Sequence, residues 1–192
     1  MPAILEVKNL VKKYGDFTAV KGITFDIQEG EIFSLLGPNG AGKTTTISML
    51  STLYDPTDGD AVIGGHSIRK APMAVRQVIG VVPQDLALYE DLTARENLVF
   101  WGQMYGLSGK PLESRVDEVL EQIGLSDKAK NRVKTYSGGM KRRVNIGVGL
   151  LHKPRLLFMD EPTVGIDPQS RRAILDTVLD LNKQGMTVLY TT

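Results

Sequence analysis

The sequence predicts an α/β protein with a mostly parallel sheet, an antiparallel β part near the N-terminus and an inserted helical segment. Short apolar runs, typical of buried strands, alternate with helical stretches in the first half of the chain and again near its end. Between these parts, residues 86–151 carry mostly helical patterns. The composition, with 42% hydrophobic and 23% charged residues, is that of an ordinary globular protein.

The first predicted elements are strands over Ile4–Val7 and Ile23–Ile27, the second followed by a turn at Glu29-Gly30. The apolar run Ile32–Leu36 ends in glycine, which is typical of a buried strand. A glycine-rich loop follows, and a helix is expected from Lys43 to about Leu53.

A strong turn signal at Asp55–Gly59 separates this helix from a predicted hairpin. The hairpin pairs Ala61–Ile63 with His66–Ile68 around Gly64-Gly65. Ile79–Val82 is then expected to be another buried strand.

The helical segment carries several helix-end signals. Thr93 and Glu96 have the spacing of a capping box. Apolar residues recur at helical spacing over 116–123, where Gly124 can end the helix. Ser137 can cap a further helix.

The last part returns to the α/β pattern. Arg155–Met159 is a predicted strand, Asp167 and Pro168 suit the start of a helix, and Met186–Tyr190 is the final predicted strand. We therefore expect one domain, with a core of residues 1–85 and 152–192 and a helical subdomain of residues 86–151.

Bulk properties exclude several classes of protein. Lysine plus arginine (23) nearly balance aspartate plus glutamate (22), so the net charge of +1 gives no reason to expect a nucleic-acid partner. There are no cysteines and only two histidines, which argues against disulfides and a dedicated metal cluster. Charged residues interrupt the N-terminal segment too early for the apolar stretch of a secretory signal. No apolar run approaches the roughly 18 residues of a membrane-spanning helix. We expect a cytoplasmic location, with any membrane role requiring a partner that spans.

The first chemical motif is a phosphate-binding loop between the strand at 32–36 and the helix from Lys43. Its glycines let backbone N–H groups wrap an anion, and the helix adds the positive end of its dipole. Lys43 would reach the β- and γ-phosphates of ATP, and the Thr44 hydroxyl would bind Mg²⁺. The alternative is a glycine-rich turn with an incidental lysine. The predicted nucleotide-binding residues of the loop are Gly37, Pro38, Asn39, Gly40, Ala41, Gly42, Lys43, Thr44 and Thr45.

The second motif places two carboxylates at the end of an apolar strand. Asp160 and Glu161 follow 156–159, where ligands of parallel sheets bind. Asp160 would hold Mg²⁺ and Glu161 would polarise the attacking water. Alone, this motif could be a strand ending in solvated acids. With the phosphate loop it indicates a P-loop NTPase core.

These two motifs do not separate the classes of P-loop protein. Asn182-Lys183-Gln184-Gly185 has a glycine where guanine recognition through N-K-x-D needs an aspartate. We therefore reject a GTPase.

A third motif narrows the class. Tyr136-Ser137-Gly138-Gly139-Met140 is similar to the L-S-G-G-Q signature of ATP-binding cassette (ABC) proteins, and the chain resembles that family over its whole length. Tyr14 matches the aromatic residue that stacks on adenine. Gln84 matches the glutamine-loop residue, expected to contact Mg²⁺ or the attacking water. Asp167 matches the D-loop.

The resemblance implies a homodimer in which two cassettes bind head to tail around two ATP molecules. Ser137–Gly139 would then meet the γ-phosphate held by the other subunit, although Ser137 could also be a plain helix cap. Equally, Tyr14 could be a strand-end tyrosine, Gln84 a surface amide and Asp167 only a helix cap.

The resemblance also implies a function: hydrolysis of ATP to power a separate transmembrane permease, with this chain held on the cytoplasmic face of the membrane. Residues 85–92 would form the docking groove, and Thr93–Leu107 resembles the exporter branch that moves drugs, lipids or polysaccharides. The alternative is a non-transport ATPase of the same family that acts on ribosomes or DNA. The short stretch between Gln84 and Ser137 leaves no room for the long coiled coil of the DNA-associated members.

The family places a histidine directly after the strand that ends near Thr192. We expect the natural sequence to continue with histidine and with the final helices of the cassette. The 192-residue chain is then expected to bind Mg-ATP but to hydrolyse it slowly.

Overall fold

The structure, a computed structural model, describes residues 3–192 and contains two four-stranded sheets. The antiparallel sheet has the order β2-β1-β4-β5, and the second sheet, with all its pairs parallel, has the order β3-β8-β7-β6. The predicted fold class is confirmed. The strands are β1 (Ala3–Tyr14), β2 (Phe17–Gln28), β3 (Ile32–Leu35), β4 (Asp58–Ile63), β5 (His66–Ser67), β6 (Ile79–Val82), β7 (Leu156–Met159) and β8 (Thr187–Thr191).

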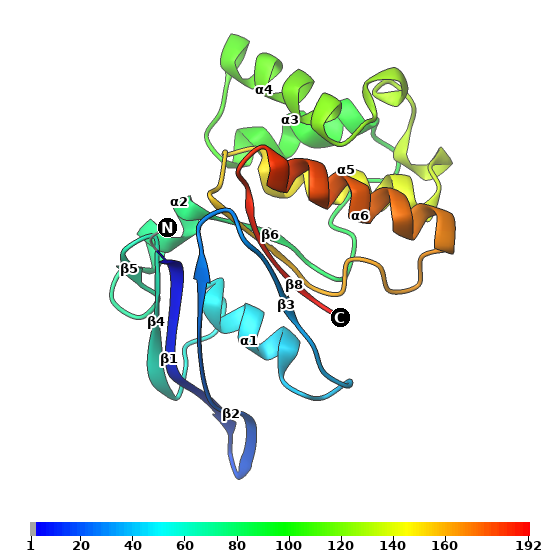
Figure 1. Ribbon diagram of the computed structural model, residues 1–192. Helices are drawn as coiled ribbons and strands as arrows, with labels where there is room; N and C mark the ends of the chain where they lie inside the picture. Colours follow the sequence, from blue (N-terminus) through cyan, green and yellow to red (C-terminus); the bar gives the residue numbers. More distant parts are fainter. Residues whose placement is uncertain (1–2) are drawn as a thin grey trace.

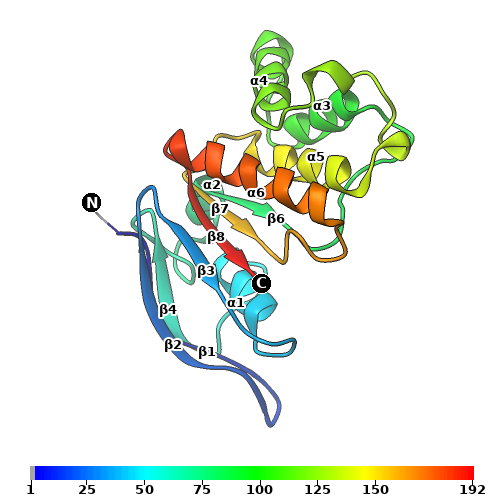
Figure 2. The same cartoon turned by 45° about the vertical axis from the view of Figure 1, so that its right-hand side comes forward.

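The helices lie on both faces of the parallel sheet. Figure 1 shows α1 beside the antiparallel sheet, and α5 and α6 on the opposite side of the parallel strands, with α3 and α4 beyond them. Figure 2 shows the parallel strands running together between these layers. The helices are α1 (Lys43–Leu50), α2 (Pro72–Val78), α3 (Ala94–Met104), α4 (Gly109–Gln122), α5 (Gly138–Leu150) and α6 (Pro168–Lys183).

Strand β7 explains how one sheet serves two hydrophobic cores. All four of its side chains are buried. Because successive side chains of a strand point to opposite faces, Leu156 and Phe158 pack with α1 and the antiparallel sheet, while Leu157 and Met159 pack with the helical layer. The continuous apolar run over residues 156–159 is thus explained by a strand whose two faces are both covered by other elements.

The predicted helix starts are confirmed. Thr93 and Glu96 form a complete capping box at α3, in which the Thr93 hydroxyl accepts from the Glu96 N–H. The Ser137 hydroxyl accepts from the Met140 N–H at α5, and the Asp167 carboxylate accepts from the Ser170 N–H at α6. Each bond satisfies a backbone donor that a helix leaves free in its first turn.

Several element boundaries differ from the prediction. The first helix ends at Leu50 and not near Leu53, because Thr52 has a left-handed backbone with φ of 61°. The first two strands extend well beyond their apolar runs, to Tyr14 and from Phe17, since ladder hydrogen bonds continue where one face is exposed to solvent. The strand at 79–82 has its predicted bounds. The others shift at their ends, so that Leu36, Ile68, Arg155 and Met186 lie outside strands and β4 begins inside the predicted turn, at Asp58.

Helix α2 was not predicted from the sequence. It is seven residues long, and Val75 is its only buried residue. Such a short helix with one core contact carries no helical repeat of apolar residues, so the pattern gave no signal.

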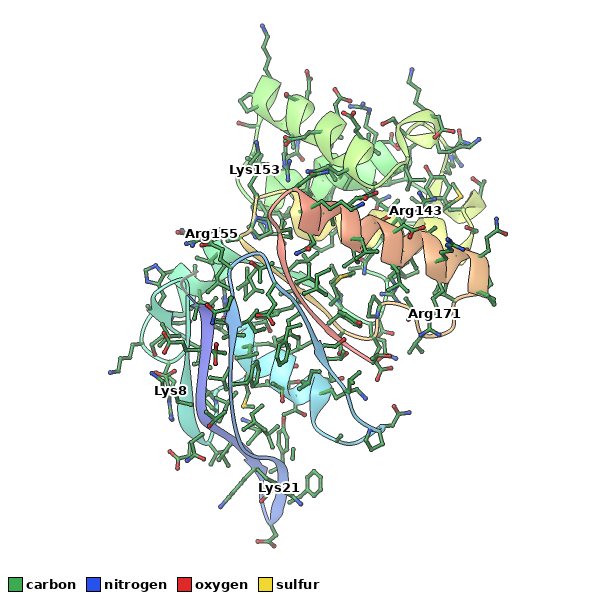
Figure 3. The ribbon with its side chains drawn as sticks, in the orientation of Figure 1. Lys8, Lys21, Arg143, Lys153, Arg155 and Arg171 are labelled. Atoms are coloured by element: carbon green, nitrogen blue, oxygen red, sulfur yellow. The ribbon has the colours of Figure 1, made fainter. Side chains whose placement is uncertain are left out.

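The helical segment is packed onto the sheet. Leu98, Val116 and Ile146 belong to the same buried cluster as Leu157 and Val188 of the parallel strands. Arg143, labelled in Figure 3, belongs to α5. Its guanidinium donates to the carbonyls of Ile123 and Gly124 at the end of α4, at 3.1 and 3.2 Å. The division into a core (residues 1–85 and 152–192) and a helical subdomain (residues 86–151) stays a prediction. Over residues 3–192, no helix combines the length and the apolar character needed to cross a membrane.

Candidate functional site

The candidate site is a cleft of about 390 Å³ where the β1–β2 hairpin, the phosphate loop and the end of β7 meet. These three parts are far apart in the sequence, and the parallel strands bring the loop and β7 to the same edge of the sheet. The cleft is lined by Tyr14, Phe17, Ala19, Asn39, Gly40, Gly42, Lys43, Thr44, Thr45, Gln84 and Glu161.

The phosphate loop has the backbone that its glycines predict. Gly40 and Gly42 have φ of 83° and 86°, which is the left-handed region that favours glycine. A side chain at Gly42 would also collide with the carbonyl oxygen of Ala19 in β2. Helix α1 begins directly after Gly42, and no side chain caps it. The N–H groups of its first turn are therefore free of capping side chains at the wall of the cleft, where an anion would be favoured.

Lys43 places a positive charge at the base of this loop. Its side chain is buried, and the ammonium donates to the carbonyls of Gly37 and Pro38 at 2.6 and 3.2 Å. The same ammonium lies 3.3 Å from Glu161 Oε1. The Lys43 ammonium thus joins two motifs that were predicted separately from the sequence. It contacts carbonyls of the phosphate loop and the carboxylate of Glu161, which follows β7.

Asp160 and Glu161 are held by the neighbouring strand. Asp160 is almost completely buried, and its Oδ1 accepts a hydrogen bond of 2.7 Å from the Thr191 hydroxyl of β8. The Glu161 N–H donates to the same hydroxyl oxygen at 2.8 Å. Glu161 has a left-handed backbone with φ of 44°, a conformation that costs a non-glycine residue roughly 1–2 kcal/mol.

Tyr14 lies at the edge of the cleft. It pairs with Phe17 across the hairpin turn, and about half of its surface is exposed. The Lys12 ammonium lies 5.2 Å from the centre of its ring. An exposed aromatic ring beside a phosphate loop can stack on a planar base. Phe17 also lines the cleft, but it was not identified as a site residue from the sequence. A predicted hairpin that pairs Tyr14 with Phe17 would have indicated its position.

Gln84 is exposed and lines the cleft from the loop after β6. Helix α5 fixes this loop: the Arg142 guanidinium donates to the carbonyls of Pro83 and Gln84 at 2.8 and 2.6 Å. The Asn145 side chain accepts from the Ala87 N–H at 3.2 Å. The glutamine loop is therefore joined to the helix that begins at the signature motif. Nothing in the spacing of the sequence indicated this link.

The oxygen groups near the loop fit a magnesium ion. Thr44 supplies a hydroxyl, Gln84 an amide oxygen and Asp160 a carboxylate, and such hard oxygen ligands are those that Mg²⁺ prefers in protein and phosphate sites. Thr44 and Gln84 line the cleft, while Asp160 is buried behind it with one oxygen bonded to Thr191. Few protein ligands are needed, because a nucleotide-bound Mg²⁺ keeps several waters and phosphate oxygens.

The signature residues do not line this cleft. Ser137 caps α5 and is exposed, with a hydroxyl hydrogen that can still be donated. Gly138 is exposed, whereas Gly139 is buried and packs so closely on α6 that an added Cβ would collide with Ser170. Asp167 caps α6 and is exposed, and the hydrogen bond from the Ser170 N–H holds the pKa of its carboxyl below the usual value.

Most predicted site residues therefore lie in or next to the cleft, and a second group lies outside it. Gly37, Pro38 and Ala41 complete the loop without lining the cleft, and Asp160 lies behind it. The signature residues 137–139 and Asp167 form a separate group at the adjacent starts of α5 and α6. The roles assigned to all these residues stay predictions.

Comparisons with known proteins agree with the motifs. Residues 20–164 match the family model described as ABC transporter. The linearmycin resistance ATP-binding protein LnrL of Bacillus subtilis is 57% identical over 98% of this chain and 60% of its own length. The doxorubicin resistance ATP-binding protein DrrA of Mycobacterium tuberculosis is 44% identical over 97% of this chain and 57% of its own length.

Solved structures share the fold. The structure of cbiO1 from Clostridium perfringens, described as part of the ABC transporter complex cbiONQ, superposes with a TM-score of 0.90 at 31% identity. The match covers 99% of this chain and 78% of that one. The chain spans about 60% of the length of the curated relatives named above.

Proposed function

Because this chain belongs to the ABC transporter family, we propose that it binds ATP with Mg²⁺ in the cleft and hydrolyses it to ADP and phosphate. We further propose that this reaction powers transport by a separate membrane-spanning partner. The proposal rests mainly on one observation: the Lys43 ammonium lies 3.3 Å from Glu161 Oε1, beside the N-terminus of α1, which no side chain caps. It puts a phosphate-binding charge and a candidate base in the same small volume.

The chain's own residues would act by position and charge. The backbone N–H groups of residues 40–45 and the Lys43 ammonium would bind the β- and γ-phosphates, and Tyr14 would stack on the adenine. Thr44, Asp160 and Gln84 would hold Mg²⁺, which would supply positive charge against the charge that develops on the phosphates. Glu161 would accept the proton of the attacking water as the water oxygen bonds to the γ-phosphorus and the bond from that phosphorus to ADP breaks.

In this arrangement Lys43 exchanges partners. Its ammonium now contacts two loop carbonyls and the Glu161 carboxylate, and a bound γ-phosphate would compete for the same charge. Glu161 would then be released from the lysine to face the water. Lys43 is buried, so the exchange of Glu161 for a phosphate oxygen keeps the charge of the lysine compensated.

A second copy would complete the site. Ser137, Gly138 and Asp167 are exposed at the starts of two neighbouring helices, away from the cleft of their own chain. We propose that they face the γ-phosphate and the cleft of a partner subunit in a head-to-tail homodimer. Two-fold symmetry would use each surface twice.

The membrane partner would dock on an apolar surface of the cassette. A groove of about 400 Å³ lies between the end of α1, α2, β6 and the end of α3, and Leu53, Ile79, Val81 and Tyr105 are among the residues that line it. Leu53 is about two thirds exposed. We propose this groove, with residues 85–92, as the seat of a permease segment, which would hold the chain on the cytoplasmic face of the membrane.

The direction of transport is proposed from the relatives. Linearmycin resistance and doxorubicin resistance are the roles given in the names of the two curated relatives described above. Resistance to such compounds suits removal from the cell, so we propose that this chain serves an exporter. Co-purification with an integral membrane protein would support transport, whereas co-sedimentation with ribosomes would support the non-transport alternative.

Hydrolysis is tested by the Glu161→Gln substitution. The variant should bind ATP with at least the affinity of the parent chain, because the cleft loses a negative charge, and its turnover should fall at least a hundredfold because the base is gone. Calorimetry and phosphate release measure the two effects. Glu113→Gln, which removes an exposed charge on α4, is the matched control. Turnover at the parent rate in Glu161→Gln would remove Glu161 from the mechanism.

A further inference from the structure

Thr191 contacts both candidate catalytic carboxylate residues through a single hydroxyl group. It lies in β8 and is completely buried, and β8 runs parallel to β7 with Tyr190 beside Met159. Asp160 directly follows Met159, and Thr191 directly follows Tyr190. The pairing of the two strands therefore brings Thr191 into contact with Asp160. The Thr191 hydroxyl bonds to Asp160 Oδ1 at 2.7 Å and to the Glu161 nitrogen at 2.8 Å.

The chemistry of the partners fixes the direction of both bonds. A backbone N–H can only donate, so the Thr191 oxygen accepts from Glu161. The hydroxyl hydrogen then donates to Asp160 Oδ1. The hydroxyl thus acts as a donor to Asp160 and as an acceptor from the adjacent residue, Glu161.

We propose that Thr191 is a positioning residue of the nucleotide site. Its hydroxyl fixes the orientation of the Asp160 carboxylate through Oδ1, and it holds the backbone of Glu161 in its left-handed conformation. The inference rests on the proposed function, because it assigns Thr191 a task only if Asp160 and Glu161 serve Mg-ATP.

The Glu161 backbone gives this inference a second support. With φ of 44°, Glu161 is one of a few non-glycine residues of the described chain in the left-handed region. That conformation turns its carboxylate to within 3.3 Å of the Lys43 ammonium. The bond to Thr191 anchors the nitrogen of the same residue, so its loss would free the backbone to relax and would move the carboxylate.

The same strand offers a matched control. Thr187, at the other end of β8, is also completely buried, and its hydroxyl accepts from the Gly30 N–H at 2.9 Å. Replacing either threonine with valine removes one buried hydroxyl and nearly preserves size. Only Thr191 touches the site.

The test compares Thr191→Val, Thr191→Ser and Thr187→Val with the parent chain. Calorimetric ATP binding is measured over a series of Mg²⁺ concentrations, together with phosphate release and thermal unfolding. We expect both valine variants to unfold at lower temperature than the parent. Thr191→Val alone should raise the Mg²⁺ concentration needed for half-maximal ATP binding by roughly tenfold, because loss of a group that orients a metal-binding carboxylate lowers metal affinity by about that factor or more.

Turnover gives an independent readout. Thr191→Val should lower kcat with little change in KM at saturating Mg²⁺, whereas Thr187→Val should keep the Mg²⁺ dependence and kcat of the parent. Thr191→Ser, which keeps the hydroxyl, should restore the Mg²⁺ dependence. If Thr191→Val does not fold, Thr191→Cys takes its place, since a thiol has similar size and is a weak donor.

The outcomes separate the inference from the proposed function. A parent chain that does not bind Mg-ATP overturns the proposed function and this inference with it. A parent chain that binds Mg-ATP, with Thr191→Val indistinguishable from Thr187→Val in Mg²⁺ dependence and kcat, overturns the inference alone.

Discussion

At the scale of single residues, the site combines groups that each lower the stability of the folded chain unless a partner compensates them. Lys43 and Asp160 are charged and buried, and Glu161 has a strained backbone. Each is stabilised by a specific partner: loop carbonyls for Lys43, and the Thr191 hydroxyl for the two acidic residues. Strain and buried charge of this kind are typical of functional sites, where position matters more than stability.

Tyr14 provides a prediction at this scale. Tyr14→Ala should weaken ATP binding about tenfold, since stacking of a base on an aromatic ring contributes roughly 1–3 kcal/mol. Tyr14→Phe should bind like the parent chain. Calorimetry with inorganic tripolyphosphate is the control, because that ligand has no base and its affinity should be the same in all three proteins. Unchanged ATP affinity in Tyr14→Ala would show that the ring only ends a strand.

At the scale of elements, the junction of α5 and α6 has a tight packing contact at Gly139. Through its resemblance to the family, the sequence predicts that Ser137–Gly139 meet the γ-phosphate held by the other subunit. In the structure, Gly139 is in addition buried, and an added Cβ would collide with Ser170. Gly139→Ala should therefore lower the free energy of unfolding by about 1–3 kcal/mol through overpacking. Chemical denaturation measures this.

Gly138 supplies the comparison for that experiment. An alanine Cβ there would lie 3.4 Å from Ile166 Cδ1, an ordinary contact, so Gly138→Ala should be nearly neutral. Equal stability of the two variants would mean that the helices can move apart freely. In that case the position of the signature motif is not set by the contact with α6.

The elements also show how far the sequence could predict this molecule. The phosphate loop, the helix caps and the buried run at β7 could be predicted, because each depends on local backbone chemistry or on an alternation within one segment. The seven residues of α2 could not, since Val75 alone is buried. Thr191, Arg142 and Asn145 were also missed, because their roles arise from contacts across 30 to 62 positions of the chain that no local pattern records.

At the scale of the whole molecule, the proposed mechanism requires two copies of the chain. The exposed Ser137 lies outside the cleft of its own subunit, so a large charged side chain there should block the ATP-dependent dimer and spare ATP binding by the monomer. Sedimentation of Glu161→Gln with and without Ser137→Arg, in the presence of Mg-ATP, measures this. Glu113→Arg, on the exposed face of α4, is the control. A Ser137→Arg chain that still dimerises would separate the signature motif from the interface.

The central claim, that the cleft binds the phosphates of Mg-ATP, is tested most directly by calorimetry of Lys43→Ala. The affinity of this variant for Mg-ATP should fall roughly a hundredfold, because the phosphates lose a buried charged donor. Lys8→Ala removes an exposed lysine that lies away from the phosphate loop (Figure 3) and should bind like the parent chain. If Lys43→Ala folds and binds Mg-ATP as tightly as the parent chain, the cleft is not the phosphate site.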